Sequence, residues 1–285
     1  MATIVRLRIA MMALALVLAL SSVAPAAPVY TVVNQAGVSP DAVRAAGEVV
    51  EKCAQFYATI LKVVLSRQIQ MHFYPNAEAF ARGLQEIARD TPQEAARWAR
   101  TATLRAIGVS ILVHQARLST LPPNDVTLSF CSAVGLMFQT ELVTERSVAA
   151  HQWMRQGHGL LLAAQALDAF GMETMATTRT RAVRVLKDQR ERNQPFPPFA
   201  SMTTRDQYLI ALEQHGPTIR PILILATDLL LGKSSPEAFL AYFRGLAIRS
   251  NVAPPRADEV FRTSFGLTVE QFQAQFDAHL AATLR

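Results

Sequence analysis

The fold of this chain is decided by residues 126–165, which read VTLSFCSAVGLMFQTELVTERSVAAHQWMRQGHGLLLAAQ. Residues 126–142 are apolar nearly all round, a pattern that predicts a helix buried on most of its sides. A polar break follows, and residues 151–167 then open on HQWMRQG and return to an apolar helix pattern. The stretch therefore predicts two helices joined by a short connection near the middle of the chain.

In outline and spacing this stretch resembles the active-site helix pair of the peptidase MA-like family of gluzincin-type metallopeptidases. In that family H-E-x-x-H on one helix and W-[L/M]-x-E-G on the next gather the zinc ligands and a general base. Here residues 131–139 read CSAVGLMFQ and residues 153–157 read WMRQG, so the match is registered on Gln139 and keeps Trp153 and Gly157. The resemblance implies an α+β fold of zincin-like architecture. A small N-terminal sheet with flanking helices would precede a mainly helical C-terminal part.

The positions that would carry the chemistry hold other residues. The resemblance places Ser132 and Leu136 where the two histidines belong, Ala133 at the general base, and Gln156 at the third ligand. Zinc takes imidazole, carboxylate or thiolate donors, which these side chains do not provide. Without a carboxylate at Ala133, no group there takes the proton from a zinc-bound water. We therefore expect a catalytically inactive protein with no metal and no other cofactor, whose degenerate motif positions line a groove.

Three hypotheses of function follow. The first is a pseudopeptidase that binds an unidentified peptide or protein partner across the former substrate groove. The second is an active hydrolase or peptidase that uses Ser132 with His151 or His158 and Asp168, although no G-x-S-x-G elbow surrounds Ser132. The third is a structural envelope protein for which the fold is only a scaffold. Stoichiometric zinc in the purified protein would restore an enzymatic interpretation.

The first 26 residues have the pattern of a signal peptide. Arg6 and Arg8 precede an apolar run at residues 9–20, and Ala24-Pro25-Ala26 offers the small residues that a signal peptidase recognises. Crossing a bilayer takes roughly 20 apolar residues, so a retained anchor is the lesser alternative. We expect cleavage near Ala26, a periplasmic or secreted protein, and contact with the membrane only through the signal peptide.

The charge of the chain is a mild positive surplus. The formal net charge of +6 becomes +4 without the two arginines of the signal segment. Basic residues concentrate only in residues 179–192, RTRAVRVLKDQRER, where they alternate with apolar ones as on the solvated face of an amphipathic helix. We therefore expect no nucleic-acid partner, in agreement with export.

Two cysteines, Cys53 and Cys131, both fall in predicted helices with apolar neighbours. An oxidising compartment would allow them to pair. Spacing in the sequence does not show whether their Cα atoms approach within about 7 Å, so two buried free thiols are the default expectation and a disulfide is the alternative.

The remaining pattern divides the mature chain into residues 27–170, with the sheet and the helix pair, and residues 171–285, the helical C-terminal part of the same domain. Strands are predicted at residues 29–34, 68–74 and 106–114, and helices at 41–65, 77–88, 93–105, 208–216, 219–231 and from 236. Residues 117–125 are predicted as a loop whose Asp125 caps the central helix, and residues 171–206 as a less regular connection around QPFPPF at 194–199. Gly216 is predicted as a left-handed helix stop, and Thr268 as the cap of a last helix that directs Phe272 and Phe276 to the core.

Overall fold

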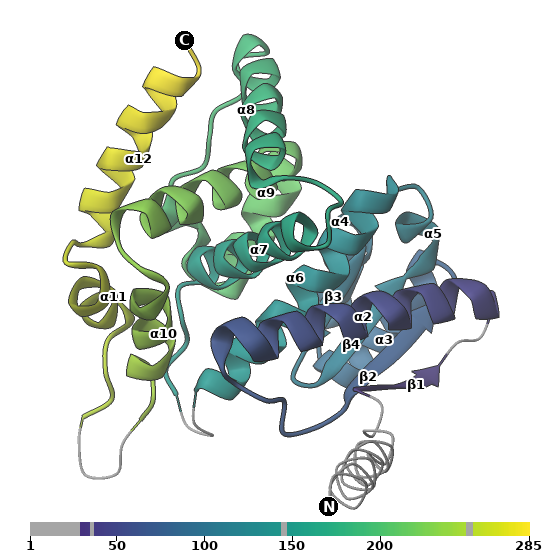
Figure 1. Cartoon of the computed structure of the whole chain (residues 1–285). Helices are drawn as coiled ribbons and strands as arrows, with labels where there is room; N and C mark the ends of the chain where they lie inside the picture. Colours follow the sequence, from purple (N-terminus) through teal and green to yellow (C-terminus); the bar gives the residue numbers. More distant parts are fainter. Residues whose placement is uncertain (1–28, 35–36, 144–146, 249–252) are drawn as a thin grey trace, which may run out of the picture.

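The computed structural model describes residues 29–34, 37–143, 147–248 and 253–285 (Figure 1). The predicted signal peptide at residues 1–26 lies outside these ranges. The elements in chain order are β1 (Tyr30–Asn34), α2 (Pro40–Leu61), β2 (Ile69–Tyr74), α3 (Ala77–Ala88), α4 (Pro92–Thr101), β3 (Leu104–Ile107), β4 (Ser110–His114), α5 (Gln115–Leu118), α6 (Pro123–Leu142), α7 (Gln152–Ala169), α8 (Met175–Glu191), the 3-10 helix η1 (Phe199–Met202), α9 (Arg205–Lys233), α10 (Pro236–Gly245), α11 (Ala257–Phe265) and α12 (Val269–Thr283). The fold is α+β and mostly helical, as predicted.

A single four-stranded sheet has the order β1-β2-β4-β3. The β1–β2 and β2–β4 pairs are parallel, whereas β3 and β4 form an antiparallel hairpin. The parallel pairs need crossovers, and the helices α2, α3 and α4 provide them. This arrangement places helices on both faces of the sheet, with α2 crossing one face in Figure 1.

Alternate residues of the central strands face two different hydrophobic clusters. Met71 and Phe73 of β2 pack with α2 and α6, and Tyr74 packs with α3, α4 and the C-terminal helices. Leu112 of β4 joins that second cluster, which extends to Leu280 and Leu284 near the end of the chain. Both predicted parts, residues 27–170 and 171–285, therefore contribute to one shared core.

The two central helices lie side by side, as the sequence predicts. Glycines allow their close approach: a Cβ at Gly159 would lie 3.2 Å from Leu136 Cδ2 and 3.3 Å from the Ser132 carbonyl oxygen. On the neighbouring face of α7, the Thr227 hydroxyl of α9 donates to the carbonyl of Gly157 at 3.1 Å. The helix α7 is thus packed between α6 and α9 and is inaccessible along most of its length.

The default expectation of free thiols is wrong, because Cys53 and Cys131 form a disulfide. The two Cα atoms are 5.4 Å apart, within the range that a disulfide spans. Helices α2 and α6 pack against each other, and the Tyr57 hydroxyl donates to the Cys131 carbonyl at 3.0 Å beside the bond. Sequence spacing does not reveal this pairing, because it depends on how two helices 78 residues apart meet.

Several predicted boundaries in the N-terminal half are wrong. The strand predicted at 106–114 is the β3–β4 hairpin, because Gly108 adopts a φ of 55° and reverses the chain. Helix α4 accordingly ends at Thr101 rather than Arg105. The predicted loop at 117–125 contains the end of α5 and the start of α6, whose N-cap is Pro122 rather than Asp125. Proline at the first helical position lacks the N–H that would need a cap, so the helix starts earlier.

In the C-terminal half, residues 171–206 are more regular than predicted, since α8 occupies Met175–Glu191 and η1 begins at Phe199, the last residue of the QPFPPF run. Helix α8 buries a narrow stripe, Thr178, Ala182 and Leu186, which its basic residues obscure in the sequence. Helix α9 is kinked at His215 instead of stopping at a left-handed Gly216. The last prediction is confirmed: Thr268 caps α12, and Phe272 and Phe276 are buried.

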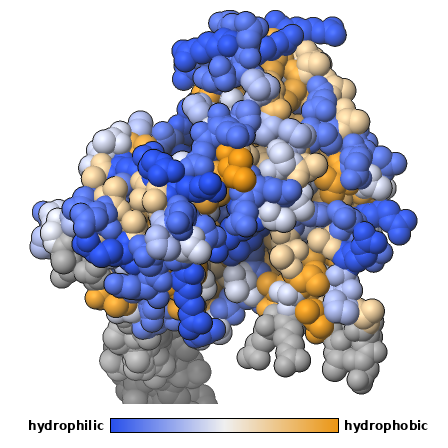
Figure 2. All heavy atoms as spheres, turned by 180° about the vertical axis from the view of Figure 1, so that it is seen from behind, coloured by the Kyte–Doolittle hydropathy of each residue, from blue (hydrophilic) through white to orange (hydrophobic). Residues whose placement is uncertain are grey.

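Among the described residues no helix is long and apolar enough to cross a membrane. The face of the molecule in Figure 2 is mainly hydrophilic, and apolar side chains form only scattered clusters on it. No large apolar patch stands out on that face. The most distinctive feature is a cavity between the helices that is lined by arginines.

Candidate functional site

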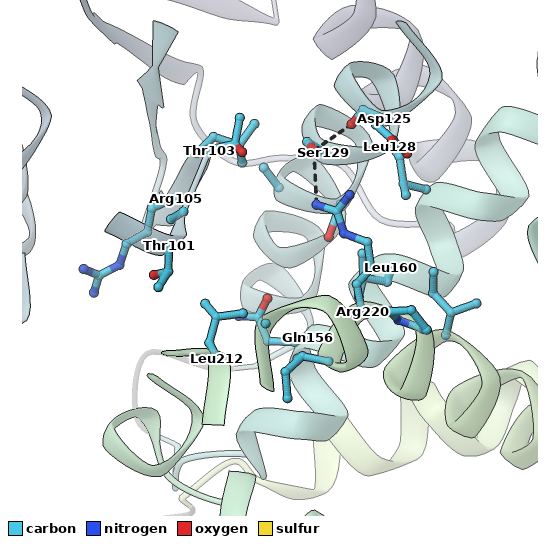
Figure 3. Close-up of a pocket in the computed structure, with 18 of the residues that line it drawn as sticks. Thr101, Thr103, Arg105, Asp125, Leu128, Ser129, Gln156, Leu160, Leu212 and Arg220 are labelled. Carbon is cyan, nitrogen blue, oxygen red and sulfur yellow. Dashed lines mark hydrogen bonds between the residues drawn. The ribbon is translucent and has the colours of Figure 1, made fainter. Parts of the chain in front are cut away.

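One face of α6 forms a wall of a cavity of about 520 Å³. Ser129, Ser132, Ala133 and Leu136 follow one another at the spacing that places side chains on the same side of a helix. Gln156 of α7 lines the same cavity (Figure 3). The structure therefore brings together four of the predicted site residues: Ser132, Ala133, Leu136 and Gln156.

The other two predicted site residues lie outside the lining. The Trp153 side chain is fully buried and stacks on Phe199 with ring centroids 4.3 Å apart. Gly157 faces α9, where a Cβ would meet Thr227 Cγ2 at 2.5 Å. Trp153 and Gly157 thus hold the packing of α7 against the C-terminal helices.

The apolar residues of α6 do not fill the cavity. Val134, Met137 and Phe138 belong to the cluster around α2 and the sheet, on another side of the helix. Of the apolar side chains of α6, only Leu128, Ala133 and Leu136 line the cavity. This face of α6 consequently remains hollow and partly open, since Arg181 and Arg205 on the lining are 30% and 41% exposed.

The groups of the hydrolase alternative are separated. The His151 Nε2 lies 2.9 Å from Asp258 Oδ1, and the His158 Nδ1 lies 3.0 Å from the Gln139 amide nitrogen. Asp168 instead accepts a hydrogen bond from the Met175 backbone N–H at 3.1 Å. Within the described ranges neither histidine lines the cavity, and no hydrogen bond joins Ser132 to either. Burial lowers the pKa of His158 to about 3, so this imidazole is neutral and serves packing.

Arginines are the feature of the site that the sequence-based prediction missed. Five of them line the cavity, with Asp125 as the one lining carboxylate of the described chain: Arg105, Arg155, Arg181, Arg205 and Arg220. Two signals in the sequence could have indicated them. Arg155 is the charged residue inside WMRQG, and Arg220 interrupts an apolar run in α9.

Three of these arginines are bound to carboxylates. Arg105 and Arg205 both pair with Asp90, whose side chain is fully buried, and the Arg105 guanidinium lies 4.5 Å from the centre of the Trp98 ring. Arg181 donates to Asp125 at 2.7 Å and lies 3.3 Å from Glu173. These pairs connect β3, α6, α8, α9 and the segment before α4 around the cavity. The charges of the three arginines are therefore compensated.

Arg155 and Arg220 have no such partner among the described carboxylates. Burial lowers the pKa of both guanidinium groups, and Asp125 partly offsets this for Arg220. Each nevertheless stays protonated, since an arginine titrates far above neutral pH. Burial also raises the pKa of the nearby Tyr208 phenol to about 12, so it lines the cavity as a neutral group. The cavity thus carries an uncompensated positive charge.

No three histidine, cysteine, aspartate or glutamate side chains come close enough to hold a metal ion within the described part of the chain. At the degenerate motif the side chains are a hydroxyl, a methyl, an isobutyl and a carboxamide. Comparison of the chain with family models, curated proteins and solved structures finds no match. The resemblance to gluzincins therefore stays a prediction from the sequence motifs.

Proposed function

We propose that this chain is an exported, catalytically inactive metallopeptidase-like protein that binds a peptide or protein segment in the cavity between α6, α7 and α9. The observation that carries the proposal is the meeting of Ser132, Leu136 and Gln156 around one hollow, the arrangement that a zinc site of zincin-like architecture would need. All three positions lack a zinc ligand. The cavity volume is within the range of ligand pockets, roughly 300–1,000 Å³.

Export is supported by two features of the chain. Residues 1–26 have the composition of a signal peptide, and Cys53 pairs with Cys131. Disulfides persist in oxidising compartments such as the periplasm and the extracellular space. Sequencing the N-terminus of the protein recovered from the periplasm or the medium tests the localisation, and a cytoplasmic protein with an intact N-terminus contradicts it.

The test of the binding role uses the full chain expressed in a bacterial host. We expect substoichiometric zinc after dialysis against the metal, no cleavage of a mixed peptide library, and saturable retention of library peptides. Stoichiometric zinc together with peptide turnover would overturn the proposal in favour of an enzyme. Absence of both turnover and retention would instead favour a scaffold.

A restored zinc site tests the ancestry separately. In the variant Ser132→His/Leu136→His/Gln156→Glu, two imidazoles one helical turn apart and a carboxylate from α7 would face the cavity. We expect this variant to bind one zinc ion per chain, measured by metal analysis. The control Val134→His/Phe138→His/Gln156→Glu introduces the same three residues, but its histidines face another side of α6. Equal zinc content in both variants would contradict the motif register.

A further inference from the structure

The cavity offers positive charge that the protein itself does not neutralise. Of the five lining arginines, Arg105, Arg181 and Arg205 are each paired with a carboxylate. Arg155 and Arg220 form no ion pair with a carboxylate of the described chain, although the nearby charge of Asp125 partly stabilises the Arg220 cation. A half-buried cation without a counter-ion is unfavourable, because desolvation is not repaid by an opposite charge. An anionic ligand would supply that charge.

The surroundings of Arg220 show where the ligand would bind. Its Nη2 donates to the Ser129 hydroxyl at 3.4 Å, a long hydrogen bond, and the Ser129 hydroxyl donates in turn to the Asp125 carbonyl at 2.7 Å (Figure 3). Among the described residues this is the only hydrogen-bond partner of the guanidinium, which carries five N–H donors. Arg105 points away from Arg220 in Figure 3. Most donors of Arg220 are therefore free for a ligand.

The rest of the lining restricts the kind of anion. Leu128, Leu136, Leu160 and Ile224 provide apolar walls near the cation. An inorganic ion would leave these walls without contacts, whereas a ligand with an apolar chain would cover them. A guanidinium binds a carboxylate through two parallel N–H···O bonds, with one charge matched by one charge. The combination fits a monoanionic head on an apolar body.

We propose that the cavity binds the carboxylate of an apolar chain, with Arg220 as its main donor and Arg155 as a second cation. This inference rests on the proposed function, because it assumes that the cavity binds its ligand without cleaving it. Two sources have this chemistry: the C-terminus of an apolar peptide and a free organic acid. Gln156 and Ser132 line the same cavity as neutral polar groups for the remaining polar atoms of the ligand.

Titration calorimetry with the full chain tests the inference on four probes. The probes are N-acetylated apolar tripeptides with a free carboxylate, the same tripeptides as carboxamides, 4-phenylbutyrate, and inorganic phosphate. We expect either the free-acid peptides or 4-phenylbutyrate to bind, which identifies the source. The free acid should bind about 10-fold or more tightly than its amide, since the amide cannot form the charge-assisted bidentate pair with Arg220.

Variants assign the effect to the arginine. Arg220→Met should remove the preference for acid over amide, and Arg220→Lys should retain part of it, since the charge remains and the bidentate geometry is lost. The exposed Arg184→Met on α8 is the matched control and should bind like the unaltered protein. Circular dichroism verifies folding, and if Arg220→Met fails to fold, Arg220→Lys and Arg155→Met supply the comparison.

Three results would overturn the inference. Equal binding of acid and amide peptides shows a cavity that binds without recognising charge, and leaves the proposed binding function intact. Tighter binding of phosphate than of either carboxylate shows a different ligand chemistry. Absence of binding by every probe contradicts the carboxylate site. Zinc-dependent turnover, in contrast, would refute the proposed function itself.

Discussion

The buried imidazole of His158 predicts a specific loss of stability in acid. Its ring contacts Phe239 and Phe243, with centroids 4.9 and 5.2 Å away, and its Nδ1 lies 3.0 Å from the Gln139 amide nitrogen. Burial lowers its pKa from 6.5 to about 3 in the folded protein. In the unfolded chain the imidazole protonates near pH 6.5. Protonation therefore favours the unfolded state as the pH falls from 6.5 towards 3, and the stabilisation is complete only above 6.5.

The size of this loss follows from linkage. Each pH unit well below the unfolded pKa contributes about 1.4 kcal/mol and the half-titrated start contributes less, so the His158 share of the loss between about pH 6.5 and pH 4.5 is roughly 2 kcal/mol. Urea unfolding followed by circular dichroism, at several pH values from about 7.5 to 4.5, measures it for the unaltered protein and for His158→Gln. The variant should be less stable at neutral pH but lose stability less steeply in acid. The other buried histidines are common to both proteins and cancel in the difference.

The exposed His279→Gln provides the control, because it changes the histidine count without removing a buried ring. Its stability should follow that of the unaltered protein at every pH. Parallel pH profiles for the unaltered protein and His158→Gln would refute the reasoning, since they would show that His158 titrates alike in both states.

Three further predictions concern stability. Reduction of Cys53–Cys131, or the double serine variant, should lower the free energy of unfolding by about 4 kcal/mol for a loop of 78 residues, measured by urea unfolding with and without reductant; equal midpoints would contradict it. Gly157→Ala should lower the free energy of unfolding by about 1–3 kcal/mol, and with it the thermal midpoint, because the new methyl group meets Thr227 of α9. The control Gly232→Ala has open space around it and should not lower the midpoint by crowding. Asp90→Asn should lower the free energy of unfolding in urea by about 3–5 kcal/mol, because Arg105 and Arg205 lose their buried partner. A decrease below about 1 kcal/mol would show that the two arginines find other partners.

The sequence predicts those helices whose apolar period matches the face that they bury in the fold. The period of apolar residues in α6 and α7 places both helices, and the capping residues of α10 and α12 mark their starts. The β3–β4 hairpin was missed because Gly108 lies inside a continuous apolar run. Helix α8 was partly missed because its buried stripe is only three residues wide. Local pattern does not reveal which helix a narrow stripe contacts.

The candidate site likewise has one part that the sequence predicts and one part that only the fold reveals. Helical phase alone brings Ser132, Leu136 and Gln156 to one cavity, because α6 and α7 pack along the faces that carry them. The charge of the cavity is a tertiary property: Arg220 comes from α9, more than 60 residues after Gln156 in the chain. Whether an arginine is compensated depends on which carboxylates the fold places beside it. No spacing rule relates Arg105 and Arg205 to Asp90.

The unpaired arginines also bear on what a cavity of this kind can bind. A zinc site concentrates two positive charges where its ligands meet, and the walls around it adapt to an anionic or polarised group. In this chain the positions that the resemblance assigns to zinc ligands are neutral, while Arg155 and Arg220 line the same hollow. The positive charge of this lining is thus provided by guanidinium groups, which can donate to a carboxylate but do not activate a water. Catalysis and recognition are separable in such a site, since the first needs a Lewis acid and a general base and the second only fixed N–H donors.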